Sequence, residues 1–181
     1  MRPAVFLDRD GTINEEVNYL SSPEEFKLIP GAGEAIRLFN QAGFAVVVIT
    51  NQSGLARGYF TEETLQKIHQ KMCKDLAAHG ARIDAIYYCP HHPDDHCSCR
   101  KPKTGLVERA AKELGLDLKK SYVIGDRYLD LLLARNIGAK GVLVLTGYGR
   151  EELEKKLPEI GLEPDIIARD LLDAAKRILQ S

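Results

Sequence analysis

The sequence has no excess of charge of either sign. Its 181 residues include 25 Lys and Arg against 26 Asp and Glu, a formal net charge of −1. Proteins that bind nucleic acid or anionic membranes generally carry a positive excess, so this balance argues against both partners, although it is compatible with a local basic pocket. We predict a small-molecule partner for this chain, which we expect to be a monomer.

The sequence also lacks a long apolar run. The longest, residues 44–49, has the length of a buried strand and is far short of the ~20 residues that span a membrane. The first seven residues lead directly to Asp8, which leaves no room for the apolar region of a signal peptide, so we expect a cytoplasmic protein. No repeat, low-complexity tract or linker divides the chain, and residues 1–181 are expected to form one domain.

Short apolar segments alternate with segments of helical periodicity. The expected strands are residues 4–7, 44–50, 83–88, 121–124, 141–145 and 165–168; the expected helices are 32–41, one that Thr61 caps and Gly80 closes, 106–114, 129–136, 151–157 and one from Asp170 onward. This alternation predicts an α/β protein with a Rossmann-like fold, in which helices cover both faces of a parallel sheet. Ligands of such sheets bind beyond the carboxyl ends of the strands.

Two carboxylates, Asp8 and Asp10, follow the first strand. Residues i and i+2 of an extended segment point to the same side, and two carboxylates in one space repel each other unless a proton or cation lies between them. With Asp126 after the fourth strand, these hard oxygen ligands suit Mg²⁺. Thr50 and Lys101 add a hydroxyl and a positive charge. Such groups favour phosphoryl transfer, in which one carboxylate attacks phosphorus and a second acid protonates the leaving oxygen.

The same segments have a simpler interpretation as turns. Asp10-Gly11 and Gly125-Asp126 are typical turn dipeptides, and a turn needs no chemistry. A turn does not, however, require a hydrophobic strand directly before each carboxylate. The placement of these groups at the ends of three separate strands therefore favours an active site.

The motifs at the strand ends resemble those of the haloacid dehalogenase superfamily of phosphatases. The matching residues are Asp8-x-Asp10-Gly-Thr12, Thr50, Lys101 and Gly125-Asp126, and the resemblance covers nearly the whole chain. It implies that Asp8 is the nucleophile, which forms an aspartyl phosphate, and that Asp10 is the general acid and then the base. It also implies that Thr50 and Lys101 hold the phosphoryl oxygens.

The resemblance further implies a metal site and a set of substrate contacts. Asp8, the backbone carbonyl of Asp10 and Asp126 would bind Mg²⁺, with Arg127 beside them where relatives often have lysine. The residues that the resemblance places in contact with substrate are Asn14, Glu16, Asn18, Tyr19, Asn51, Gln52, Ser53 and Arg100. We also expect Arg57, in the loop after the second strand, to meet a distal group of the substrate, since a bisphosphate needs cations at both ends. The segment between Thr12 and Thr50 has room for only a loop and a helix, so we expect no large cap domain and an open site.

More narrowly, residues 8–14, 50–61, 89–93 and 97–102 resemble the heptose 1,7-bisphosphate 7-phosphatases, whose near relatives are the histidinol-phosphate phosphatases. This resemblance implies removal of the 7-phosphate from a D-glycero-D-manno-heptose bisphosphate. The loop between His91 and Cys97 is short, as in the histidinol-phosphate enzymes, which makes histidinol phosphate the alternative substrate. A phosphoryl-binding sensor without turnover is a second alternative, against which the intact Asp8, Asp10, Lys101 and Asp126 argue.

Three of the four cysteines lie within an irregular segment, residues 89–103. Cys89, His91, Cys97 and Cys99 form a closed set of Zn²⁺ ligands, which predicts a structural metal in the loop that carries Arg100 and Lys101. His92 and His96 are alternative imidazole ligands. Free thiols in an exposed loop or a catalytic cysteine are the competing interpretations, and no base with an orienting carboxylate supports the latter.

One further histidine and cysteine, His69 and Cys73, are four residues apart in the second expected helix, which Thr61 caps and Gly80 closes. No third ligand is evident near them, so we predict that neither binds a metal. Cys73 is expected to pack as a small apolar side chain.

Overall fold

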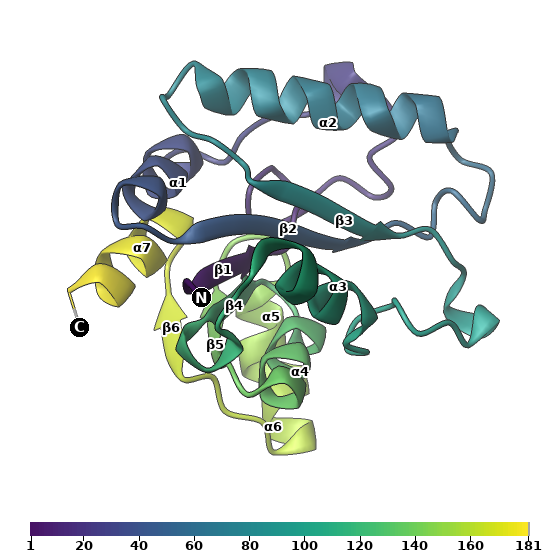
Figure 1. Cartoon of the computed structure of the whole chain (residues 1–181). Coiled ribbons are helices and arrows are strands. Elements are labelled where there is room, and N and C mark those ends of the chain that lie inside the picture. The colour runs from purple at the N-terminus through teal and green to yellow at the C-terminus, as the bar shows by residue number, and fades with distance from the viewer. Residues whose placement is uncertain (181) are drawn as a thin grey trace.

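The computed structural model describes residues 1–180, which are built around one parallel sheet of six strands (Figure 1). The strands lie in the order β3-β2-β1-β4-β5-β6, and every neighbouring pair is parallel. Their bounds are β1 (Ala4–Leu7), β2 (Ala45–Asn51), β3 (Ala85–Cys89), β4 (Tyr122–Gly125), β5 (Lys140–Val144) and β6 (Ile166–Ala168). The predicted α/β class and parallel sheet are confirmed.

Helices cover both faces of the sheet because its central strands are apolar on both sides. The helices are α1 (Ala32–Gln41), α2 (Glu62–Ala77), α3 (Gly105–Leu114), α4 (Tyr128–Ile137), α5 (Gly149–Glu151), α6 (Leu157–Ile160) and α7 (Leu171–Leu179). One core cluster joins α1, α2 and α7 to one face of the sheet, and a second joins α3 and α4 to the other (Figure 1).

Short helical turns complete the connections. They are the 3-10 turns η1 (Pro23–Glu25), η2 (Pro93–Asp95) and η3 (Leu118–Lys120), and the π-helical turn η4 (Glu152–Lys156), which lies between α5 and α6. The helix predicted over 151–157 is therefore longer and contains this change of winding. Between β1 and β2 the chain forms only loop, η1 and α1, as predicted.

The register of the sheet brings the predicted functional segments to one edge. Leu7 at the end of β1 pairs with Val48 of β2 and with Ile124 of β4. Asp8 therefore lies level with Gly125, the last residue of β4, and with Ile49, two residues before the end of β2. This edge receives the side chains that follow each strand, whatever their distance in the sequence.

Helix α2 confirms one prediction and corrects another. The Thr61 hydroxyl accepts a hydrogen bond from the Thr64 backbone N–H at 3.1 Å, as expected of an N-cap. Cys73, however, is exposed, so its predicted role as an apolar packing residue is wrong. The buried stripe of the helix runs through Ile68, Met72 and Leu76, and the next residue after Met72 is turned about 100° around the axis by the 3.6-residue repeat. Within residues 1–180 no helix combines the length and apolar character needed to cross a membrane.

Candidate active site

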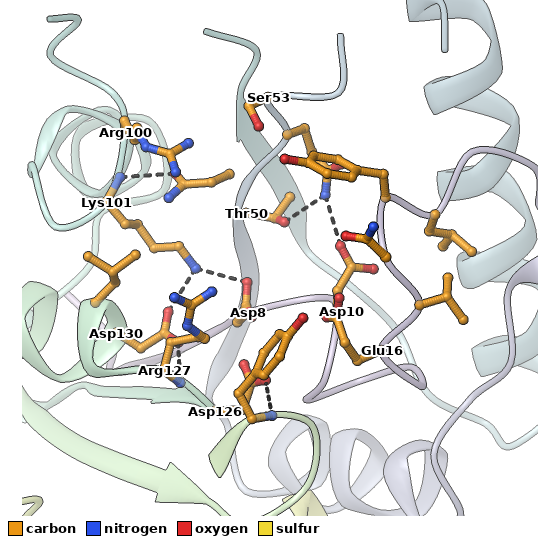
Figure 2. Close-up of a pocket in the computed structure, with 18 residues that line it drawn as sticks. Asp8, Asp10, Glu16, Thr50, Ser53, Arg100, Lys101, Asp126, Arg127 and Asp130 are labelled. Carbon is orange, nitrogen blue, oxygen red and sulfur yellow. Dashed lines mark hydrogen bonds and ion pairs between the residues drawn. The ribbon is translucent and has the colours of Figure 1, made fainter. Parts of the chain in front are cut away.

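A cavity of about 300 Å³ opens at the carboxyl edge of the central strands (Figure 2). Its lining includes these predicted site residues: Asp8, Asp10, Glu16, Asn18, Tyr19, Thr50, Asn51, Gln52, Ser53, Arg100, Lys101, Asp126 and Arg127. Asn14 and Arg57 are the predicted substrate contacts that do not line it. The sequence reasoning passed over two polar residues in the wall, Asp130 and Tyr148.

Lys101 joins two carboxylates at the base of the cavity (Figure 2). Its ammonium group lies 2.9 Å from Asp8 Oδ1 and 2.7 Å from Asp130 Oδ1, and it donates to the Ile49 carbonyl at 2.8 Å. Burial would lower the pKa of Lys101, but Asp130 and Asp8 outweigh that effect and raise it above its usual value. The lysine is therefore a permanent positive charge beside Asp8.

Asp130 is the partner that the sequence reasoning missed. It lies in the first turn of α4, where its second oxygen accepts a hydrogen bond from the Arg127 backbone N–H at 3.2 Å. Gly125 is required beside it, because a Cβ at that position would overlap the Asp130 carboxylate. A signal was present: an acidic residue in the first turn after a strand caps the helix and lies next to the strand end.

One carboxylate oxygen of Asp126 accepts no hydrogen bond from the described residues. Its Oδ2 accepts from the Tyr148 backbone N–H at 2.9 Å, whereas its buried Oδ1 has no partner among residues 1–180. Gly11 and Gly147 pass so close to this carboxylate that a Cβ on either would overlap it. Burial, Asp8 and Asp130 raise the pKa of Asp126 well above its usual range. A buried carboxylate oxygen without a donor is suited to act as a cation ligand.

Carboxylate oxygens of Asp8, Asp126 and Asp130 lie within 4.8 Å of one another. Their hard oxygen atoms, with the unpartnered Asp126 Oδ1, fit a divalent cation such as Mg²⁺. Asp130 is already engaged by Lys101 and by a backbone N–H, so Asp8 and Asp126 are the freer pair. The cluster contains the two predicted carboxylates, Asp8 and Asp126, together with Asp130.

Asp10 is held by donors on both of its oxygens. Oδ1 accepts from Asn14 Nδ2 at 3.0 Å, and Oδ2 accepts from Gln52 Nε2 at 3.2 Å. Burial would raise the pKa of Asp10, but the adjacent Arg9 charge and the bonds from Arg9, Asn14 and Gln52 lower it. Asn14 is fully buried and supports Asp10 from behind the cavity. Gln52 also donates to the Thr50 hydroxyl at 2.9 Å, which links the ends of β1 and β2.

Aromatic and cationic side chains form the outer part of the site. The Tyr19 and Tyr59 rings meet edge to face at 4.9 Å between centroids, and the Arg57 guanidinium lies 5.5 Å from the Tyr19 ring centroid. On the opposite side, Arg127 bonds Glu152 at 2.9 Å. Arg57 therefore reaches the site through two lining residues, Tyr19 and Ser53, to whose hydroxyl its Nε donates at 3.4 Å.

Two further lining residues are suited to a polar ligand. Arg100 has a buried Nη1 group without a hydrogen-bond partner among the residues described. Burial, Asp10 and Asp8 raise the pKa of Glu16 to about 7. An unpaired guanidinium N–H and a carboxyl group that is partly protonated near neutral pH can both donate to ligand oxygens.

The cysteines and the histidine of the irregular loop form a second candidate metal centre. One ligand atom from each of Cys89, His91, Cys97 and Cys99 lies within 4.8 Å of the others. Three thiols and one imidazole at this separation fit a tetrahedral metal ion. His92 is engaged elsewhere, because its ring nitrogen accepts from the Asp94 backbone N–H at 3.2 Å.

The loop is fastened to the active site directly after the last cysteine. The Lys101 backbone N–H donates to the Asn51 side-chain oxygen at 3.0 Å, which joins the loop to the end of β2. The Lys101-Pro102 peptide bond is cis. The position of the Lys101 ammonium therefore depends on the same segment that carries the Cys and His cluster.

Comparison with known proteins places these features in a family context. A model described as polynucleotide kinase 3 phosphatase matches residues 4–128, and one described as HAD-hydrolase-like matches residues 98–174. The D-glycero-D-manno-heptose-1,7-bisphosphate 7-phosphatase of Thermosynechococcus vestitus is 42% identical over 98% of this chain and 95% of its own length. The corresponding β-heptose enzyme of Pseudomonas aeruginosa is 41% identical over 99% of both chains.

Solved structures give the same result. The D,D-heptose 1,7-bisphosphate phosphatase from B. bronchiseptica, complexed with magnesium and phosphate, superimposes with a TM-score of 0.91 at 42% identity, over 99% of each chain. The enzyme of the same name from Burkholderia thailandensis has a TM-score of 0.76 at 35% identity, over 99% of this chain and 100% of its own.

Proposed function

The chain belongs to the heptose 1,7-bisphosphate 7-phosphatase family of the haloacid dehalogenase superfamily, and we propose that it removes the 7-phosphate of D-glycero-D-manno-heptose 1,7-bisphosphate. The observation that carries this proposal is the grouping of Asp8, Asp10 and Asp126 around one cavity, with Lys101 bonded to Asp8. A nucleophile, an acid–base group and a permanent cation are the parts that phosphate monoester hydrolysis requires.

We propose that Mg²⁺ is held by Asp8, the backbone carbonyl of Asp10 and Asp126. The unpartnered Asp126 Oδ1 and the crowding of carboxylates support this assignment. When bound, the ion supplies positive charge that offsets the carboxylates and polarises the phosphoryl oxygens. The B. bronchiseptica structure, described as a complex with magnesium and phosphate, supports the same choice of ion.

The chemistry divides into two steps on the chain's own residues. One Asp8 oxygen attacks phosphorus, the bond to the leaving oxygen breaks, and the Asp10 carboxyl group gives its proton to that oxygen. Asp10 then takes a proton from water, which attacks phosphorus and releases Asp8 and inorganic phosphate. The negative charge of a bound ester raises the proton affinity of Asp10 and so allows it to carry the proton of the first step.

The cavity offers separate groups for each end of the substrate. Lys101 and the Thr50 hydroxyl would hold oxygens of the phosphoryl group that is transferred. The unpaired N–H of Arg100 would meet the distal phosphate, with Arg57 as a second cation held at the rim against Tyr19. Glu16 and Asn18 would contact sugar hydroxyls, since both line the cavity.

We propose that Zn²⁺ occupies the cluster of Cys89, His91, Cys97 and Cys99 and has a structural role. Four protein ligands leave no open position, which is the pattern of structural zinc sites. The ion would order the loop and thereby place Arg100 and Lys101. Cys3His sets bind Zn²⁺ well because thiolates are soft ligands.

The substrate assignment is tested by kcat/KM with Mg²⁺ for both anomers of the heptose bisphosphate and for histidinol phosphate. The short segment between His91 and Cys97 is the feature that favours histidinol phosphate. We expect one heptose anomer to be preferred by about 100-fold, or about 2.7 kcal/mol of transition-state discrimination. The same margin for histidinol phosphate would refute the assignment. Binding of phosphate without turnover of any ester would instead identify a sensor.

A further inference from the structure

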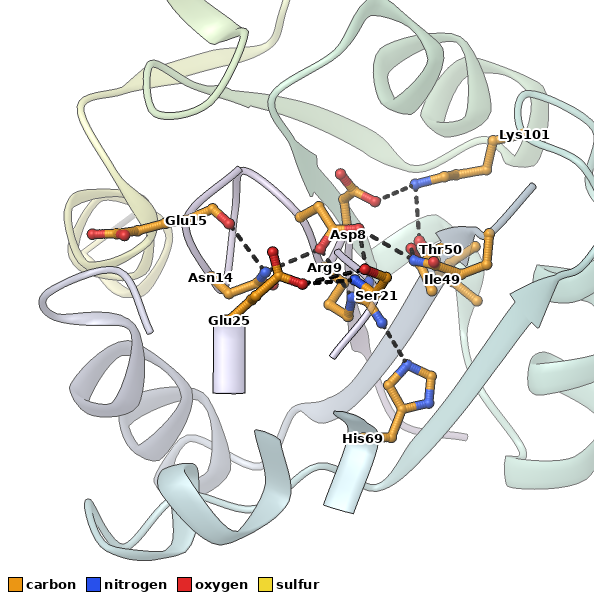
Figure 3. Close-up of polar contacts among 12 residues, drawn as sticks. Asp8, Arg9, Asn14, Glu15, Ser21, Glu25, Ile49, Thr50, His69 and Lys101 are labelled. Atoms are coloured by element: carbon orange, nitrogen blue, oxygen red, sulfur yellow. Dashed lines mark hydrogen bonds and ion pairs between the residues drawn. The ribbon is translucent and has the colours of Figure 1, made fainter. Parts of the chain in front are cut away.

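A fully buried arginine connects the acid–base carboxylate to helix α2. The Arg9 side chain is 0% exposed, and its Nε and Nη2 groups donate to the two oxygens of Asp10 at 3.1 and 3.0 Å. Its remaining terminal nitrogen, Nη1, lies 3.1 Å from Nε2 of His69, which reaches it from α2 (Figure 3). These contacts form a continuous series from helix α2 through the His69 imidazole and the Arg9 guanidinium to the Asp10 carboxylate.

The chemistry of the two side chains fixes the direction of the His69 contact. A guanidinium can only donate, so the His69 nitrogen that faces Arg9 accepts, and the ring is neutral with its proton on the other nitrogen. Burial and the Arg9 charge lower the pKa of His69 to about 3, which agrees with a neutral ring. The imidazole therefore holds one corner of the planar guanidinium while Asp10 holds the opposite edge.

The residues packed around Asp10 leave one side of its carboxylate open to the cavity. Arg9 and Asn14 approach the carboxylate from behind, because neither lines the cavity. Gln52 donates to Oδ2 and does line the cavity. Oδ2 is therefore the oxygen that faces the substrate, and its aim is set by the plane of the guanidinium.

We propose that Arg9 and His69 are positioning residues that aim Asp10 at the oxygen of the leaving group. This inference rests on the proposed function, in which the Asp10 proton passes to the leaving oxygen as the bond from phosphorus to that oxygen breaks. Asp8 attacks phosphorus from the neighbouring position and has no contact with either residue in the described hydrogen bonds. Loss of this orientation of Asp10 should therefore slow proton transfer to the leaving oxygen and leave the attack of Asp8 on phosphorus unchanged.

The dependence on the leaving group separates positioning from simple support of the fold. A basic leaving group needs the proton, whereas p-nitrophenolate leaves readily without it. A variant that is only less stable has fewer active molecules and loses activity on every ester in the same proportion. The ratio of kcat/KM between an ester with a basic leaving group and p-nitrophenyl phosphate therefore reports the orientation of Asp10 independently of stability.

The test compares His69→Leu, which cannot accept, with His69→Gln, whose side-chain oxygen can. We expect His69→Leu to lower kcat/KM about tenfold or more for the heptose bisphosphate and phenyl phosphate, since general acid catalysis contributes ~10²–10⁴-fold. For p-nitrophenyl phosphate we expect a loss below about threefold, and His69→Gln should restore most of the lost activity. Ile68→Val is the matched control, because Ile68 is equally buried on α2 and belongs to the apolar core.

Several results would overturn the inference. An equal loss on all three esters, no loss on any, or a failure of His69→Gln to restore activity would each show that the contact does not aim Asp10. If His69→Leu does not fold, Arg9→Lys carries the test, because one ammonium cannot bond both Asp10 oxygens and His69. A parent protein that hydrolyses only the aryl esters refutes the heptose assignment, yet phenyl and p-nitrophenyl phosphate still test the aim. A parent protein without activity on any ester refutes both.

Discussion

The buried His69 ring makes the free energy of unfolding sensitive to pH between about 3 and 6.5. Its pKa falls from 6.5 to about 3 because of burial and the Arg9 charge, which lies 3.1 Å away. Below pH 6.5 the unfolded chain binds a proton that the folded protein excludes, so stability falls as the pH falls toward 3. At pH 5 this difference amounts to about 2 kcal/mol relative to neutral pH, since each pKa unit is worth ~1.36 kcal/mol.

Urea unfolding at pH 7 and pH 5 measures this effect when the parent protein is compared with His69→Gln. Carboxylates and metal ligands also titrate in this range, but they are common to both proteins and cancel in the difference between them. We expect the parent to lose about 2 kcal/mol more than His69→Gln on acidification. Equal losses in the two proteins would show that the folded His69 ring accepts a proton, and would refute the donor–acceptor direction assigned to its contact with Arg9.

Three other predictions concern the candidate active site and the loop that carries Cys89, His91, Cys97 and Cys99. Asp8→Asn should reduce turnover by at least about 10³-fold without loss of the fold, measured with the heptose bisphosphate; substantial remaining activity would exclude an aspartyl phosphate. Asp130→Asn should destabilise the protein by about 3 kcal/mol in urea, because it breaks a buried ion pair with Lys101, and an unchanged midpoint would contradict this. Cys99→Ser should lower the zinc content from about one ion per chain, whereas the exposed Cys73→Ser should not.

The fold could be predicted because each strand has its own local pattern. Residues 4–7 and 45–50 are apolar on both faces, as in a parallel sheet with helices on each side. Asp8, Thr50 and Asp126 could then be placed together without a structure, because the carboxyl ends of parallel strands share one edge. The change to π-helical winding at η4 has no equally clear signal, since its Glu and Lys residues suit an ordinary α-helix as well.

The parts of the site that escaped prediction depend on contacts between elements. Arg9 is charged and lies between two predicted site residues, yet it is fully buried because a histidine 60 residues later accepts from it. Asn14 belongs to a segment expected to contact substrate, but the turn after β1 directs it beneath Asp10. Cys73 differs from Met72 only by its place around the helix, and the sequence places both near an apolar stripe. In each case the decisive fact is which element lies opposite the side chain.

The charges of the cavity favour the proposed binding of a cation together with a phosphate ester. Five carboxylates line it, at Asp8, Asp10, Glu16, Asp126 and Asp130, against the three cations Arg100, Lys101 and Arg127. Burial and the crowding of these groups raise the pKa of Glu16 and of Asp126, and a phosphate ester would add further negative charge beside Asp8, where Lys101 is the cation within hydrogen-bond distance. A divalent cation held by Asp8 and Asp126 would offset negative charge near phosphorus, while Arg100 keeps its unpaired N–H for the far end of the ligand. We therefore expect affinity for the ester to rise when the cation site is occupied, because each ligand supplies charge that offsets the other.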